Sequence, residues 1–247
     1  MAGNNTHPGQ QLIAPRPAGR GDQGEGADLF FHAIATLHAP VYRSENAGAL
    51  RQDWPRIPLP ASSALLRASA ALGQQVAALL DPETPVAGVT CGDLLPALLP
   101  LARLRRADGS SVQPQAGDLT LTAGWGHAGR GGIVMPARGR VTERDYTAEE
   151  RAALGEAIGS LGERTCDIWL NERACWRNVP LAVWDYTIGG YQVIKKWLPY
   201  REQPLLGRDL TTDEARYISA VVRRIAALLL MGPELDASYR ACGGGEE

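Results

Sequence analysis

The sequence from Val183 to Leu198 constrains the fold more than any other stretch, because its hydrophobic pattern changes period partway along. Residues 183–186 alternate between aromatic and other side chains, which is typical of a strand. From Tyr191 onward the apolar residues recur at helical spacing. We expect Gly189-Gly190 to form a tight strand-to-helix turn, where the free N–H groups of the new helix can receive an anion. The alternative is a structural turn followed by a solvated lysine pair, Lys195-Lys196.

Helices are predicted at both ends of the chain. Asp28 can cap a helix that Pro40 ends, and Ser62 or Ser63 can cap a second helix that stops at Asp81-Pro82. Three prolines between them, in residues 55–60, predict an extended connector.

The last predicted helix has the clearest signals. The pattern Thr211-x-x-Glu214 is a capping box, and Gly232-Pro233 should end the helix with a C-cap glycine and a breaker. Between these limits one apolar stripe should face the core: Ala215, Ile218, Val222, Ile225 and Leu229.

The middle of the chain is predicted to be mostly β. Strands are expected at residues 119–122, 133–135, 168–170 and 179–186, with a Gly-rich loop at 124–132 and short turns over 82–118. Thr147-x-x-Glu150 is a second capping box, opening a short helix. We therefore predict an α+β fold, in which N- and C-terminal helices pack on a small, mostly antiparallel sheet from the middle of the chain.

Composition limits the classes of function. The chain has 247 residues and a net charge of −2, which counts against a simple basic protein that coats DNA. Charge is uneven along the sequence, since residues 101–144 carry a local net charge of +4 and residues 176–224 carry +3. A recognition module with a local basic face remains compatible with this distribution.

Metal, cofactor and membrane roles are not expected. The four cysteines lack the close pairing of zinc ligands, which favours free buried thiols in a reducing cytoplasm. There is no N-terminal apolar signal core, and the longest apolar run, Ile225 to Met231, is too short to span a membrane. No spacing identifies a catalytic set, so we expect no catalytic residue, no cofactor and no metal in this chain.

Several blocks occur in one order along residues 28–240. They are Leu37-His38-Ala39-Pro40 with Tyr42-Arg43, Trp54–Pro58, Val179-Pro180, the Val183–Leu198 stretch, Tyr200-Arg201, and Leu210-Thr211 with Glu214. Together they resemble the C-terminal specificity region of Type ISP restriction-modification enzymes, which are single-polypeptide and Type I-like, and more loosely the target-recognition regions of Type IIG enzymes. The resemblance implies sequence-specific recognition of double-stranded DNA within a machine that methylates adenine and cleaves unmodified DNA.

The chain departs from that family in what it lacks. No two prolines are adjacent, so the methyltransferase motif Asn/Asp-Pro-Pro-Tyr/Phe is absent, and there is no Gly-x-x-x-x-Gly-Lys-Ser/Thr loop for a helicase motor. We therefore expect a specificity end without its catalytic domains, whether a split subunit, a remnant or an excised domain. A methyltransferase, helicase or nuclease polypeptide is the expected partner.

The candidate DNA-binding residues are all basic. In the Gly-rich loop, Arg130 could contact guanine in the major groove, and Arg138 and Arg140 could join the same face. The full set is Arg130, Arg138, Arg140, Arg177, Lys195, Lys196 and Arg201. The structural alternatives are a mobile hairpin loop, a solvated helix face for the lysines, and an Arg177 that extends past a core Trp176 to solvent.

Two rival functions remain open at this level. One is a small hydrolase that uses His127 or Asp185, and the other is a protein-interaction module or remnant that binds no DNA. DNA recognition predicts that Arg130, Arg138, Arg140 and the two lysines share one concave face. The expected domain limits are a disordered leader at 1–27, one specificity domain at 28–240 and a disordered tail at 241–247.

Overall fold

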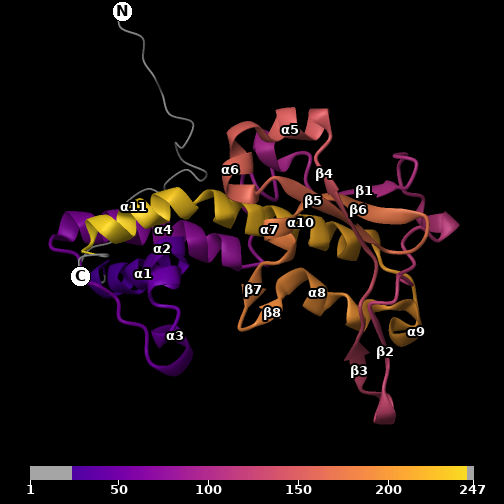
Figure 1. Cartoon of the computed structure of the whole chain (residues 1–247), viewed down its shortest axis with the longest axis horizontal. Coiled ribbons are helices and arrows are strands. Elements are labelled where there is room, and N and C mark those ends of the chain that lie inside the picture. Colours follow the sequence, from indigo (N-terminus) through magenta and orange to yellow (C-terminus); the bar gives the residue numbers. More distant parts are fainter. Residues whose placement is uncertain (1–23, 244–247) are drawn as a thin grey trace, which may run out of the picture. The chain divides into compact units, whose positions relative to one another are not determined.

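The chain forms two compact units. The computed structural model describes residues 24–243, and its first unit contains residues 24–91 and 230–243, whereas the second contains residues 92–229 (Figure 1). Most of the expected leader and tail lie outside the described residues, although the first helix already begins at Gly24. The antiparallel sheet lies within the second unit and helices flank it, which confirms the predicted α+β class.

The first unit is helical. It consists of α1 (Gly24–His38), α2 (Pro40–Glu45), α3 (Ala49–Gln52), α4 (Ser63–Leu80) and α11 (Gly232–Ala241). Helices α1 and α4 approach closely at Gly73, which lies against the backbone of Phe31. A Cβ at this position would overlap the Phe31 carbonyl, so the close approach requires glycine. Pro40 does follow the end of α1, but it opens α2, since proline fits the first position of a helix.

Residues 54–60 have no regular structure, as the prolines predict. Buried His32 anchors this segment with its two ring nitrogens, which lie 2.8 Å from Ser69 Oγ and 2.8 Å from the Pro58 carbonyl. Ser62 then caps α4 by accepting the Leu65 N–H at 3.3 Å, and α4 ends at Leu80, as predicted.

The second unit is built on a four-stranded antiparallel sheet. Its strands are β1 (Arg103–Arg106), β4 (Val141–Asp145), β5 (Arg164–Trp169) and β6 (Ala174–Pro180), in the order β1-β6-β5-β4. Around them lie η1 (Pro96–Leu98), η2 (Pro114–Ala116), α5 (Ala148–Leu154), η4 (Gly155–Ala157) and α6 (Ile158–Leu161). The predicted Thr147 and Glu150 capping box is present at α5.

Helix α10 (Thr212–Leu230) packs on this sheet. Trp176 is fully buried and donates its indole N–H to the Ala215 carbonyl at 2.9 Å, and Ser219 donates to the Ala102 carbonyl at 2.8 Å. Thr211 and Glu214 form the predicted capping box. The predicted stripe is buried except for its last member, Leu229, which is half-buried.

The end of α10 differs from the prediction. Gly232 is not a C-cap glycine, because it is the first residue of α11 and Pro233 lies in the first turn of that helix. The Gly-Pro pair therefore separates two helices and starts the second one.

The Val183–Leu198 stretch also differs from the prediction. Residues 181–184 form a short helix, α7 (Leu181–Trp184), and the glycine pair joins two strands of a hairpin, β7 (Thr187–Ile188) and β8 (Tyr191–Gln192). Gly189 and Gly190 both have positive φ, 58° and 81°, as a tight hairpin turn requires. Helix α8 (Val193–Trp197) begins only after this hairpin, so no helix N-terminus lies at the glycine pair.

The Gly-rich region is a projecting hairpin. Strand β2 (Gly126–Ala128) lies inside the segment that was predicted to be a loop and pairs with β3 (Val134–Pro136) across the tip η3 (Arg130–Gly132). Residues 119–122 are not a strand. Leu119 and Leu121 are nevertheless buried, and their carbonyls accept the N–H groups of Leu210 at 3.1 Å and Gln203 at 2.7 Å. Gln203 is the first residue of α9 (Gln203–Leu206), which follows η5 (Pro199–Arg201), and Leu210 lies beyond α9.

The four cysteines are free. Cys166, Cys175 and Cys242 are buried, as predicted, whereas Cys91 is exposed. Burial raises the pKa of the Cys175 thiol to about 12 and also raises that of Cys166, so these thiols are structural and unreactive.

Candidate nucleic-acid interface

A buried carboxylate fixes the base of the β2–β3 hairpin. Trp125, directly before β2, is fully buried and donates its backbone N–H to the carboxylate of Glu202. Its indole N–H donates to the Trp169 carbonyl at 2.9 Å, and its ring meets Trp184 edge-on at 5.8 Å. Burial raises the pKa of Glu202, although the N–H groups of Trp125 and Gly124 oppose that shift by stabilising the carboxylate.

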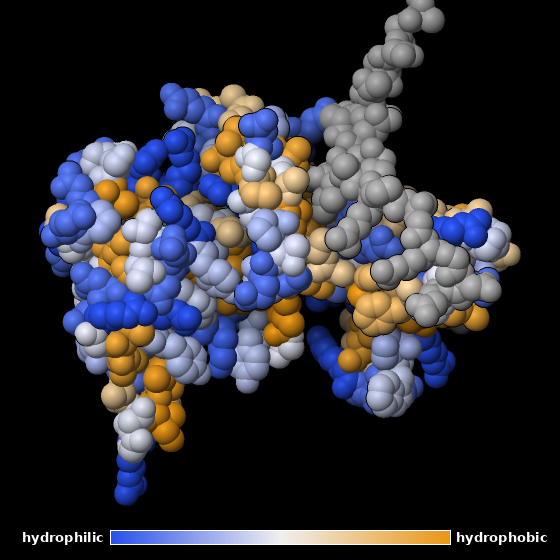
Figure 2. Space-filling view, turned by 180° about the vertical axis from the view of Figure 1, so that it is seen from behind, coloured by the Kyte–Doolittle hydropathy of each residue, from blue (hydrophilic) through white to orange (hydrophobic). Residues whose placement is uncertain are grey.

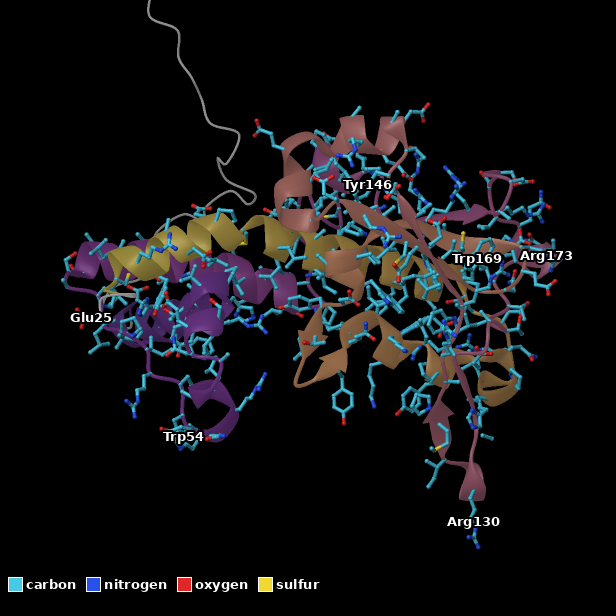
Figure 3. The ribbon with its side chains drawn as sticks, viewed as in Figure 1. Glu25, Trp54, Arg130, Tyr146, Trp169 and Arg173 are labelled. Atoms are coloured by element: carbon cyan, nitrogen blue, oxygen red, sulfur yellow. The ribbon has the colours of Figure 1, made fainter. Side chains whose placement is uncertain are left out.

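Backbone hydrogen bonds continue past the ends of β2 and β3, at the base of the hairpin. The Ala137 N–H donates to the Trp125 carbonyl at 2.7 Å, and the Gly139 N–H donates to the Gly124 carbonyl at 2.8 Å. Gly139 has a φ of 67°, and a Cβ there would overlap the Trp125 indole, so this position requires glycine. The hairpin is thus anchored firmly at its base, while its tip extends away from the sheet, with Arg130 at the far end (Figure 3).

A groove lies between the two hairpins of the second unit. It has a volume of about 240 Å³, and we call it the lysine groove. Its walls come from β3, from the turn and second strand of the β7–β8 hairpin, from α8 and from η5. The lining residues are Val134, Pro136, Gly190, Tyr191, Gln192, Lys195, Lys196, Pro199 and Tyr200.

Aromatic rings hold one of the two lysines. The Lys196 ammonium lies 4.6 Å from the centre of the Tyr191 ring and 5.7 Å from that of Tyr200. Among the described residues, no acidic side chain forms an ion pair with Lys195 or Lys196. Their positive charge is therefore available to an anionic ligand.

A second groove, of about 630 Å³, lies beside the sheet, and we call it the arginine groove. It is lined by Gly117, Thr120, Thr122, Ala123, Gly124, Arg140, Asn171, Glu172 and Arg173. The Arg140 guanidinium lies 4.2 Å from the Trp169 ring, an arrangement that leaves its N–H edges able to donate outward. Asn171 shapes the groove by donating to the carbonyls of Asp118 at 3.0 Å and Thr120 at 2.8 Å.

Two predicted residues are held by the protein itself. Arg177, on β6, has its Nε 3.8 Å from a carboxylate oxygen of Asp167, which is also bonded by Arg144. The Arg201 guanidinium lies 4.0 Å from the Trp197 ring. Both arginines are half-buried, so their charge contributes to the fold as well as to the surface.

The structure thus separates the predicted cations into groups, rather than gathering them on the one concave face that the sequence analysis expects. Lys195 and Lys196 share the lysine groove, Arg140 lines the arginine groove, and Arg130 and Arg138 are exposed on or beside the projecting hairpin. Sequence reasoning missed Arg173 in the arginine groove and did not place Tyr191 as a wall. The available signal for Tyr191 was the Gly-Gly pair, which is typical of a hairpin turn that exposes the next residue.

The groups proposed for a hydrolase are not assembled into a pocket. His127 is exposed on β2, and Asp185 is exposed after α7, where it accepts a bond from Gln192 at 3.1 Å. Across residues 24–243, no group of three or more His, Cys, Asp or Glu side chains is arranged to hold a metal ion. Within the same residues, no helix has the length and apolar character needed to cross a membrane.

The second unit thus presents two hairpins and two grooves that are lined in part by basic side chains. The family model of the Type ISP C-terminal specificity domain matches residues 13–226, and the chain belongs to this family. It is therefore a target-recognition module of the restriction-modification type. No curated protein and no solved structure matches the chain.

Proposed function

We propose that this chain binds double-stranded DNA and selects the target sequence for a restriction-modification assembly. Methylation of adenine and cleavage of unmodified DNA would belong to other domains or to a partner polypeptide, acting in the cytoplasm. Residues 28–240 would act together as the specificity region.

The lysine groove is the observation that carries this proposal. Lys195 and Lys196 line a groove between two hairpins and have no acidic partner in the described part of the chain. Phosphate contacts of this kind fix the register of a protein on the duplex but do not read its sequence. Base contacts would come from the adjacent β2–β3 hairpin.

The charge of that hairpin supports separate roles for the two surfaces, with phosphate contacts from the lysine groove and base contacts from the hairpin. From Leu119 to Thr142 the sequence contains no Asp or Glu, but it contains Arg130, Arg138 and Arg140. The segment itself therefore presents no negative side chain to a polyanion, although Glu172 lies with Arg140 in the lining of the arginine groove. In the arginine groove, Arg140 would provide a further phosphate contact, whereas Arg173 already lies 3.8 Å from a carboxylate oxygen of Asp118.

A gel-shift competition tests the proposal. The 247-residue chain is incubated with labelled randomised duplex at two salt concentrations, with unlabelled duplex and a soluble polyanion as competitors. We expect binding that weakens steeply with salt, as counterion release requires, and that duplex competes better than the polyanion. Absence of any duplex binding at the lower salt concentration would refute the proposal.

A protein-interaction role is the second candidate, and the first unit carries the observation that favours it. Trp54 and Leu59, in the extended segment, are 85% and 76% exposed, and Phe30 on α1 is 60% exposed. Large exposed apolar side chains are typical of surfaces that contact another protein. Under this candidate, the chain would retain no duplex, and Trp54→Ala would weaken its association with a methyltransferase polypeptide.

A further inference from the structure

The two faces of strand β3 have different environments. Val134 and Pro136 line the lysine groove, whereas Met135 between them points to the opposite side, because side chains alternate along a strand. Ile133 directly precedes β3 and has an extended backbone. Ile133 is 66% exposed and Met135 is 45% exposed. Figure 2 shows hydrophobic surface along this projecting hairpin, which ends in a hydrophilic tip.

The surroundings of these apolar side chains indicate what covers them. They belong to the acid-free segment from Leu119 to Thr142, and Arg130 lies just before Ile133 at the tip. A ligand that matches this surface must be anionic outside and apolar inside. Stacked base pairs between two phosphate backbones have this arrangement, whereas an ordinary protein surface lacks the continuous negative charge.

The shape of the tip indicates which groove of the duplex it fits. Gly129, Gly131 and Gly132 have no side chains, and the last two have positive φ values of 72° and 79°. The Arg130 side chain extends from the tip of the hairpin (Figure 3). A turn of bare backbone is suited to the minor groove, which is only about 6 Å wide and attracts arginine where it is narrow.

The base of the hairpin has the rigidity that insertion requires. Unstacking bases opposes entry, so an inserted side chain must be held by a support that does not bend away. Here the buried Glu202 carboxylate holds Trp125, and Gly126 packs so closely on Pro199 that a Cβ would overlap the proline. The strain of insertion would therefore be transmitted to the sheet rather than absorbed by a flexible loop.

We propose that the β2–β3 hairpin enters the minor groove and that Ile133 wedges between two stacked base pairs, which bends the duplex. This inference rests on the proposed DNA-recognition function, and it moves Arg130 to a different groove from the one expected from the sequence. A wedge favours base steps that unstack easily, so the preferred ligand is a duplex with a flexible pyrimidine–purine step at the insertion point.

The test uses the full chain and a duplex that it retains from a randomised pool. Donor and acceptor dyes at the two ends report bending, and 2-aminopurine placed at successive positions reports unstacking. We expect binding to bring the ends together and to raise 2-aminopurine fluorescence at one step. Ile133→Ala should abolish most of both signals and weaken binding roughly tenfold.

Ile188→Ala is the matched control, because Ile188 is 54% exposed on the other hairpin of the same unit. This variant should leave both signals unchanged. A bound duplex that stays straight and stacked would overturn the inference while leaving the proposed function intact. Signals that survive in Ile133→Ala would also overturn it, as would an Ile133→Ala defect confined to association with a partner polypeptide. If no duplex is retained at all, the proposed function fails as well.

Discussion

The carboxylate of Glu202 accepts the backbone N–H of Trp125, and this bond joins the base of the β2–β3 hairpin to the segment that follows η5. The Glu202 side chain is buried, and its only described hydrogen-bond donors are the N–H groups of Trp125 and Gly124. A carboxylate held in this way makes the stability of the hairpin depend on pH.

The first prediction concerns that dependence. Because burial raises the pKa of Glu202 in the folded state, the folded protein keeps a proton that the unfolded chain has already lost. The free energy of unfolding should therefore decrease as pH rises from the ordinary glutamate pKa through the raised value. Urea denaturation across this range should show a flatter profile for Glu202→Gln, and an unchanged profile would contradict the assignment.

Glu214 provides a test of opposite sign. Its hydrogen bonds from Arg208, with a further bond from Thr211, lower its pKa to about 2. Its stabilisation is therefore complete above the ordinary glutamate pKa and is lost as pH falls toward about 2. We expect Glu214→Gln to lose less stability than the wild type on acidification, as measured by urea midpoints. An equal loss in both proteins would show that the ion pair between Arg208 and Glu214 contributes nothing to stability.

The core of α10 can be tested by truncation. Ile225 is 6% exposed, so Ile225→Ala should lower the free energy of unfolding by about 2–5 kcal/mol through lost burial and the cavity left behind. Arg216→Ala, at an exposed position of the same helix, should change stability little. Thermal melts of both variants check this expectation, and an unmoved Ile225→Ala melt would place Ile225 outside the core.

The lysine groove makes a separate prediction about salt. Removing two phosphate contacts with Lys195→Ala and Lys196→Ala together should reduce the slope of log affinity against log salt by about 2. Binding should weaken alike for all duplex sequences. The control is Arg151→Ala with Arg164→Ala, since these exposed arginines already pair with Glu163 and Glu143. Equal slopes for the two double variants would mean that the lysines are only solvated.

Some elements could be predicted because their signals are local. Helix α10 combines a capping box with an apolar stripe of period 3.6, and the Ser62 cap marks the start of α4. The capping box and the Ser62 cap each join residues within one turn at the start of a helix, and the stripe lies along a single helix. They therefore do not depend on what the rest of the chain contributes.

Other elements could not be predicted because long-range partners decide them. Strand β1 reads Arg-Leu-Arg-Arg, without apolar alternation, and exists through its pairing with β6, as in the register of Arg103 with Arg177. Tyr191 has helical spacing to Ile194, but it lies in a strand and is 63% exposed. The burial of Leu119 and Leu121 imitates a strand, although backbone bonds from distant residues hold them.

The same distinction applies to the candidate site. Its basic residues could be chosen from local charge and glycine content. Their division between the lysine groove and the arginine groove depends on where β8, α8 and β4 lie in the folded unit. Arg177 lies on β6, and nothing in the sequence around it indicates that Asp167 lies beside it in the folded sheet.

The central claim is that this chain reads a DNA sequence through the β2–β3 hairpin. Sequencing the duplexes that the wild type and Arg130→Ala retain from one randomised pool tests it most directly. We predict one enriched motif for the wild type, and the same motif with a relaxed preference at a single base pair for Arg130→Ala. A wild-type pool that remains random, or identical motifs from both proteins, would contradict the account.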